Sequence, residues 1–358
     1  MISTVKFNNK LQIEFVTALK QRVDDFFKSN KRSKYGGIKI LFKIIVFTFL
    51  YFGGYALILS NLFNVYEMWL FTVVMGISAA GIGMTYMHDA NHNSLSKNKK
   101  INKIVSLSAD MLGVSSLNWK IQHNILHHTY TNIENLDEDI NSRPLYRFTK
   151  GAKHYKFHKF QHIYMFFLYG LMTLIWSLSA DFSQMKRFYK EGLLGKKRNY
   201  KTEISKLIIS KLIYFAYILV LPFFLVDITW WQVLIGFFTM HFFTGLILAL
   251  TFQLAHLVEK TEFPEPVDGR IDENWSVHQL KTTADFAQKN KLLGWYIGGL
   301  NFQVEHHLFP HISHVHYPDI AKIVKQTTDE FGIRYNVYDT FAQAVKSHIQ
   351  MLKKMGKE

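Results

Sequence analysis

Apolar residues in this chain fall into long blocks separated by polar and charged stretches. A helix needs roughly 20 apolar residues to cross about 30 Å of hydrocarbon. Four of the five blocks reach this length comfortably, and the third is the shortest. The pattern therefore predicts an all-α integral membrane protein. The blocks run Ile38–Ser60, Tyr66–Met87, Ile163–Asp181, Leu207–Val226 and Trp231–Thr251.

Lysine and arginine are absent from two windows, Ile44–Ser96 and Leu212–Glu259, each of which holds two apolar blocks and a short loop. Because basic loops stay in the cytosol, both short loops are expected outside. If the third block also crossed, the basic stretch Gln184–Lys206 would be external. The charges therefore favour four transmembrane helices in two hairpins, with Ile163–Asp181 in the interface or packed on a helical cytosolic cap.

This topology divides the chain into three parts. Residues 1–37 form a cytosolic N-terminal segment whose polar composition does not match a signal peptide. Residues 38–323 form the membrane-embedded domain, with an interfacial block at 163–181. Residues 324–358 form a basic C-terminal tail. Both termini and the middle of the chain are expected in the cytosol.

Composition narrows the possible chemistry. The chain has no cysteine, which excludes disulfides, iron–sulfur clusters, heme–thiolate ligation and cysteine nucleophiles. Its 17 histidines are therefore the main source of metal ligands. The net charge of +15 fits an anionic membrane surface. No helix-turn-helix, zinc-finger or RNA-binding signature supports a nucleic-acid partner.

Eight of the 17 histidines gather in clusters that the topology places on the cytosolic side. On an α-helix, residues four apart share a face, so His88 and His92 can converge on one metal. His123 and His127 can do the same, while His128 points about 100° away and could reach a second metal. Eight histidines and one glutamine are too many for one ion, so the clusters predict a di-metal site. The clustered residues are His88, His92, His123, His127, His128, His256, Gln303, His306 and His307.

Six further histidines are isolated and expected to be structural. No His-Glu-x-x-His motif, glycine-rich phosphate loop or nucleophile elbow accompanies the clusters, which argues against a zinc protease, a nucleotide-binding enzyme and a serine hydrolase. The isolated histidines are His154, His158, His162, His241, His278 and His348.

Arranged as H-x3-H, H-x3-H-H and Q-x2-H-H, the clusters resemble the three histidine boxes of the membrane fatty acid desaturase family. The likeness covers Ile38–Ile323. Glutamine at position 303 resembles the front-end branch, which acts between an existing double bond and the carboxyl end, and some sphingolipid desaturases share it. Flanking residues also match: Asn118 and Trp119 before the second box, Thr129–Asn132 after it and Leu308–His311 after the third.

The resemblance implies an oxygen-dependent acyl desaturase that introduces a cis double bond with two Fe ions and O2 as co-substrate. The eight clustered histidines would be the iron ligands, and Gln303, a weaker donor, occupies a further ligand position. Asp89, Asn91 and Glu305 are expected to orient ligand imidazoles. Trp119 is expected either to wall an apolar substrate tunnel or to sit at the membrane interface.

The implied partners are a lipid substrate and an electron carrier. The acyl carrier would be coenzyme A, a phospholipid or carrier protein. The histidine positions leave no ligand pair for the fused cytochrome b5 domain of eukaryotic front-end enzymes, so electrons are expected from ferredoxin or free cytochrome b5 with its reductase. The expected location is a bacterial inner membrane. The electron carrier would dock on the basic segments, which are Lys186–Lys206 and the four lysines Lys346, Lys353, Lys354 and Lys357. Alternatively, these segments face anionic lipid headgroups.

Two rival functions remain open at this stage. A related di-iron hydroxylase acting on lipids or alkanes would share the boxes and differ in its product. A histidine-rich metal or heme transporter belongs to another class, but transporters hold their ligands near the bilayer midplane, whereas these clusters are expected at one face.

Overall fold

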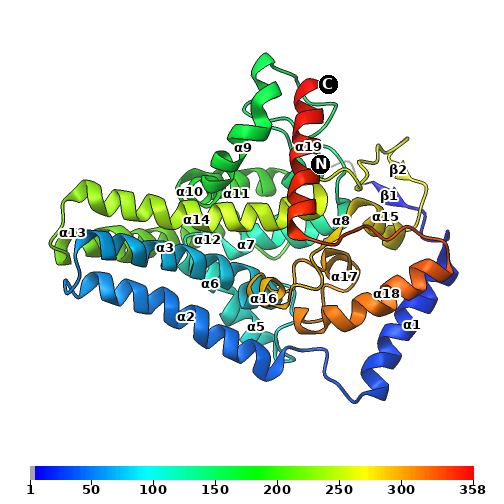
Figure 1. Cartoon of the computed structure of the whole chain (residues 1–358), viewed down its shortest axis with the longest axis horizontal. Helices are drawn as coiled ribbons and strands as arrows, with labels where there is room; N and C mark the ends of the chain where they lie inside the picture. The colour runs from blue at the N-terminus through cyan, green and yellow to red at the C-terminus, as the bar shows by residue number, and fades with distance from the viewer. Residues whose placement is uncertain (1–4) are drawn as a thin grey trace.

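The structure is a computed structural model that describes residues 5–358, and helices form almost all of its regular elements. Long helices lie side by side in one half of the molecule, and shorter ones gather at one end of them (Figure 1). Within the described residues, the strands are two-residue segments paired in parallel. They are β1 (Lys6–Phe7) with β2 (Arg270–Ile271), and β3 (Asp285–Phe286) with β4 (Val337–Tyr338).

Four helices are long and apolar enough to cross a membrane, which confirms that part of the prediction. They correspond to the first, second, fourth and fifth apolar blocks. Two of them contain a π-helical turn. The four are α2 (Gly37–Leu59); Val65–Asn91, made of α3 (Val65–Ile82), η1 (Gly83–Met87) and α4 (His88–Asn91); Tyr200–Leu225, made of α12 (Tyr200–Phe215), η6 (Ala216–Val220) and α13 (Leu221–Leu225); and α14 (Trp230–His256).

Helix α3 packs against both α2 and α14. Gly76 permits the second contact, since a Cβ atom there would lie 2.6 Å from the carbonyl oxygen of Met240. Methionine, tyrosine and phenylalanine side chains fill the space between the helices, and Tyr51 is fully buried among them. These contacts place the ends of α4 and α14, where histidines occur, on the same side of the molecule.

The third apolar block forms a bent pair of helices, Lys156–Gly170 and Met172–Lys190, with 53° between them. If this pair counts as one span, the candidate spans number five. The pair packs along α14, and a Cβ atom on Gly245 would lie 2.7 Å from the carbonyl oxygen of Tyr169. Its elements are η4 (Lys156–Phe160), α9 (Gln161–Gly170), α10 (Met172–Ile175), η5 (Trp176–Ala180) and α11 (Asp181–Lys190).

Polar contacts attach this block to the long helices. The buried Lys211 ammonium of α12 lies 2.5 Å from the Asp181 carboxylate. The hydroxyl of Thr173 lies 3.1 Å from Nδ1 of His241 on α14. The block expected at the interface or on the cytosolic cap is thus packed against two of the long helices.

The two terminal segments are also helical and packed. Helix α1 (Ile13–Ser29) packs against α18 (Tyr317–Glu330); residues 1–4 of the expected N-terminal segment lie outside the described residues. The expected basic tail contains α19 (Phe341–Lys357), which starts with a capping box at Thr340 and buries Met351, Leu352 and His348. Short elements complete the fold: α5 (Lys99–Ser106), α6 (Ser108–Met111), α7 (Ser116–Trp119), η2 (Lys120–His127), α8 (His128–Tyr130), η3 (Glu138–Ile140), α15 (Trp275–Thr282), α16 (Lys291–Tyr296), α17 (Gln303–Leu308) and η7 (His314–His316).

Candidate metal centre

Four segments that are far apart in the sequence bring the eight clustered histidines together. Helix α4 carries His88 and ends at His92, and α14 ends at His256. The π-helical segment η2 and the turn after it carry the second cluster, and α17 carries His306 and His307. All of these side chains except that of His92 are at most 5% exposed, so the centre is largely closed to water.

One group of donor atoms comes from His88, His92, His123 and His306, which lie within 4.8 Å of one another. The Nε2 atom of His123 lies 3.3 Å from that of His88 and 3.3 Å from that of His306. His128 joins them, with its Nε2 atom 2.9 Å from that of His306. Nitrogens bound to one ion at about 2.0–2.1 Å are themselves roughly 3 Å apart. The spacing of this group therefore fits metal ligation.

A second group comes from His127, His256 and His307. The Nε2 atom of each is buried and has no hydrogen-bond partner among residues 5–358. Buried polar atoms nearly always have partners, so three orphaned nitrogens facing one point fit a metal ion. His128, His306 and His307 form a further set that connects the two groups.

The two histidines of the π-helical segment η2 are divided between the two donor groups. Their rings do stack on one face, with centroids 5.3 Å apart. However, His123 belongs with His88 and His306, whereas His127 belongs with His256 and His307. A fourth set joins both of them to the carboxylate of Asp139. Spacing alone had paired His123 and His127 on one metal.

Burial makes most of these imidazoles neutral. Burial, followed by repulsion from neighbouring imidazoles, lowers the pKa of four of them well below the usual histidine value: His123, His128, His306 and His307. A neutral imidazole offers the lone pair that a metal needs. His127 differs. Burial lowers its pKa, but the nearby carboxylates of Asp137 and Asp139 outweigh this effect and raise the pKa of His127 to about 9.

Hydrogen bonds to the outer nitrogens hold several rings in place. Nδ1 of His127 donates to the Asp137 carboxylate at 3.0 Å, and Nδ1 of His307 donates to the amide oxygen of Gln279 at 2.7 Å. Nδ1 of His306 lies 3.2 Å from the Tyr317 hydroxyl. Such contacts fix the tautomer and point Nε2 inward.

Comparison with known proteins agrees with this geometry. Residues 64–339 match the fatty acid desaturase family. The chain is 38% identical to the sn-1 linoleoyl-lipid 6-desaturase of Arthrospira platensis, over 79% of this chain and 77% of that protein. It is 34% identical to the enzyme of the same name from a Synechocystis species, over 99% and 98%. It is also 34% identical to the acyl-lipid (8-3)-desaturase of Physcomitrium patens, over 99% and 74%.

The chain belongs to the fatty acid desaturase family. It is an oxidoreductase, and its long apolar helices agree with the membrane location of that family. The resemblance drawn from the histidine boxes is thereby confirmed.

The three polar residues expected beside the desaturase imidazoles have other partners. Asp89 accepts a hydrogen bond from Ser313 at 2.6 Å, and Nδ1 of His314 lies 3.0 Å from its other carboxylate oxygen. Asn91 donates to the backbone of its own helix. Glu305 accepts from Tyr335 at 3.1 Å. These residues brace the helices that carry the histidines, while the ring contacts come from elsewhere.

Sequence reasoning missed the residues that do contact the rings. Gln279 carried no signal, because it lies 28 residues from His307. Asp137 carried a weak signal, as an acidic residue in the loop after the second histidine cluster. His314 was also missed; it connects Asp89 to the buried Lys43, whose ammonium lies 2.8 Å from its Nε2 atom.

Gln303 and Trp119 both lie close to the centre. The amide of Gln303 is buried and has no hydrogen-bond partner within the described part of the chain, which suits a ligand position. The Trp119 ring lies 4.5 Å from that of His123. It lines an apolar cavity of about 50 Å³, the inner cavity, together with Met87 and Phe252. The Phe252 ring is 5.9 Å from that of His123.

The isolated histidines stay outside the donor groups. His241 accepts a hydrogen bond from Tyr214 at 2.7 Å, and His348 bonds the Leu257 carbonyl at 2.8 Å. His158 and His278 are buried, and His154 bonds the Gly356 carbonyl. His162 lies on α9 in the bent pair. Hydrogen bonds thus hold His154, His241 and His348, whereas both ring nitrogens of His278 are buried without a partner among residues 5–358.

Proposed function

We propose that this chain is an oxygen-dependent acyl-lipid desaturase that introduces a cis double bond, using two iron ions held by the eight clustered histidines. One observation carries the proposal: two adjoining groups of buried imidazole donors lie against an apolar cavity bounded by Trp119. The first group supplies His88, His92, His123 and His306, the second His127, His256 and His307, and His128 lies between them.

Desaturation removes two hydrogen atoms from neighbouring methylenes, a step that side chains alone cannot perform. Bound iron would supply the oxidising power. One O2 would combine with the two hydrogen atoms of the acyl chain, two electrons from the carrier and two protons from solution, and the product would be two water molecules. The protein holds the acyl chain beside the centre, where Trp119, Met87 and Phe252 form an apolar wall. Asp137 and Gln279 keep their imidazoles oriented.

We further propose that the substrate is an acyl lipid and that the reaction is of the front-end type. The named activities of the relatives include 6-desaturation and (8-3)-desaturation of acyl lipids. The third histidine box also begins with Gln303, whose unpartnered amide suits a weak or water-mediated ligand. A lipid hydroxylase would share this centre, and a sphingolipid desaturase would share the glutamine.

Expression in a host that lacks polyunsaturated lipids tests the proposal. Lipids extracted from cells fed linoleate should contain a new cis double bond between the existing one and the carboxyl end. Purified protein should hold about two irons per chain by metal analysis. New hydroxyl groups would favour the hydroxylase, while unchanged lipids with altered metal or heme uptake would favour a transporter.

The sidedness is part of the proposal. If the centre and both termini are on the cytosolic side of a bacterial inner membrane, Lys196 lies on the cytosolic side and Asp227 on the periplasmic side. The two positions flank opposite ends of the helix Tyr200–Leu225. Reporter fusions should therefore give a cytosolic signal at Lys196 and a periplasmic one at Asp227. A periplasmic signal at Lys196 would mean that the bent pair spans the membrane.

A further inference from the structure

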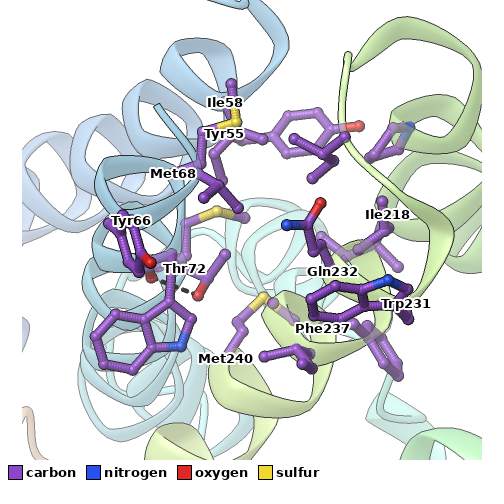
Figure 2. A pocket seen from close by; sticks show the side chains of 18 residues that line it. Tyr55, Ile58, Tyr66, Met68, Thr72, Ile218, Trp231, Gln232, Phe237 and Met240 are labelled. Atoms are coloured by element: carbon purple, nitrogen blue, oxygen red, sulfur yellow. Dashed lines mark hydrogen bonds between the residues drawn. The ribbon is translucent and has the colours of Figure 1, made fainter. Parts of the chain in front are cut away.

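A second, larger cavity lies at the far end of the long helices from the histidines. This outer cavity has a volume of about 420 Å³. Figure 2 shows Met68 and Thr72 of α3 on one wall and Ile218 and Trp231 on the other, with Met240 between them. The inner and outer cavities share Met240 as a lining residue.

The two cavities are stacked along the helix axes. On α2, Tyr51 lines the inner cavity and Tyr55, one turn away, lines the outer one. On α3, Ala79 lines the inner cavity and Met75, one turn away, lines the outer one. Residues four apart lie above one another on a helix, so the cavities meet end to end at the level of Tyr51 and Met240.

A hydrogen-bonded partition of Tyr51 and Tyr217 lies beside Met240 at this junction. The Tyr217 hydroxyl donates to the carbonyl oxygen of Met111 at 2.5 Å and accepts from the Tyr51 hydroxyl at 3.1 Å. The Tyr51 hydroxyl also lies 3.8 Å from Sδ of Met240. Tyr51 is therefore fixed by its hydroxyl, while Met240 is an unbranched side chain that can change rotamer.

The lengths of the cavities suggest what each one holds. Along α14, the inner cavity runs from Phe252 to Met240 and the outer one from Met240 to Trp231. At about 1.5 Å per residue these stretches are roughly 18 Å and 14 Å long. One leaflet holds an acyl chain in about 15 Å, half of the hydrocarbon core. The inner stretch thus has the length of one ordinary chain, which must widen the narrow inner cavity to enter it, and only a longer chain would reach the outer cavity.

We propose that Tyr51, Tyr217 and Met240 form a stop that sets the acyl-chain length this desaturase accepts, and that the outer cavity takes the methyl end of chains that pass it. The inference rests on the proposed function, because it assumes that the acyl chain runs from the histidines into the inner cavity. Met240 is the positioning residue whose removal opens the stop.

The test compares Met240→Ala with wild type and with Met68→Ala, a matched control that lines the outer cavity away from the partition. Cells receive linoleate or the C20 and C22 fatty acids that carry the same two double bonds counted from the carboxyl end, and the new double bonds are counted in each chain length. Opening the stop should raise the ratio of C22 to C18 product by about tenfold, as expected when a pocket end no longer rejects extra methylenes. Adding Val233→Phe, which fills the outer cavity, should restore the wild-type ratio.

A second readout does not need turnover. The chain has no cysteine, so Thr72→Cys places a single thiol in the outer cavity and Ser60→Cys places one on the exposed loop as a control. In the Met240→Ala background, behenoyl phosphatidylglycerol should protect the Thr72→Cys thiol from a maleimide and stearoyl phosphatidylglycerol should not. Equal ratios in all three proteins, or equal labelling with both lipids, would overturn the stop. If wild type makes no double bond in any chain, the proposed function itself fails and the stop fails with it.

Discussion

The two ends of the long helices differ in how their buried space is used. Helix α14 begins beside the outer cavity at Trp231 and ends at His256 in the centre. At the histidine end, polar groups are buried, and hydrogen bonds connect several of them to distant segments; the amide nitrogen of Asn132 donates to the carbonyls of His256, Glu262 and Thr282. At the other end, apolar and aromatic side chains surround an open volume.

This contrast predicts different tolerance to change at the two ends. A buried polar group that loses its partner costs its full desolvation energy, so the histidine end should fail after single substitutions. Apolar lining beside an existing void has fewer contacts to lose. The outer end should therefore accept changes of size that alter which lipid fits rather than whether the protein folds.

The largest effect is expected at the centre itself. His307→Ala removes a donor from the second group and leaves the amide oxygen of Gln279 with Thr131 as its remaining side-chain partner. Product should fall by more than about 100-fold, together with iron content. His154→Ala, an exposed histidine outside the donor groups, should keep both. Equal losses in the two variants would show that the donor assignment is wrong.

The same substitution at the two ends should have unequal costs. Met84 is fully buried near the histidine end, whereas Met68 is 5% exposed and lines the outer cavity. Met84→Ala should lower the free energy of unfolding by about 2–5 kcal/mol, because it creates a new void. Met68→Ala should cost about 2 kcal/mol or less, since one side of it already faces open volume. Thermal unfolding in detergent measures both, and a reversed order would contradict the contrast.

A smaller effect is expected from the residues that orient the rings. Asp137→Asn keeps the size of the side chain but removes the charge that faces Nδ1 of His127 at 3.0 Å. Loss of such a contact typically lowers metal affinity or activity about 10–100-fold. Asp139→Asn acts on the same nitrogen from 3.5 Å and should cost less. Iron titration of the two purified variants measures the difference in their metal affinity. That difference should vanish if both carboxylates only stabilise the loop.

The sequence alone predicted the long helices and the histidine clusters because both depend on local patterns. Apolar blocks of sufficient length form spans wherever they occur, and histidines four apart share a helix face. It could not foresee the π-helical segment η2, which divides His123 and His127 between groups. The spacing of the histidines does not show that this segment is wound as a π-helix.

Long-range contacts account for the other differences. The third apolar block has the composition of an interfacial helix, yet a buried ion pair between Asp181 and Lys211 attaches it to α12. Asp89 and Glu305 lie beside histidines in the sequence, but helix geometry turns their side chains toward Ser313 and Tyr335. A neighbour in sequence points to another side of a helix, so partners for a ring must come from other segments.

The smallest effect is expected on the surface, where an electron carrier would dock. The chain has no cysteine for an iron–sulfur cluster, and we propose that ferredoxin or cytochrome b5 with its reductase supplies the electrons. Four lysines lie exposed on α19, while Met351, Leu352 and Met355 of the same helix are buried. Opposite charge speeds the encounter with an acidic carrier. The exposed lysines are Lys346, Lys353, Lys354 and Lys357.

Replacing Lys346, Lys353 and Lys357 with glutamine should slow carrier-dependent turnover several-fold at low salt. The difference should shrink as the Debye length falls below about 8 Å, because screening removes the steering. The matched control changes Lys10, Lys20 and Lys28, which are also exposed, and so removes the same charge from another surface. Equal slowing would indicate a general charge effect, and no slowing in either would mean that α19 faces lipid headgroups. Turnover with a nicotinamide cofactor alone would contradict the need for a carrier.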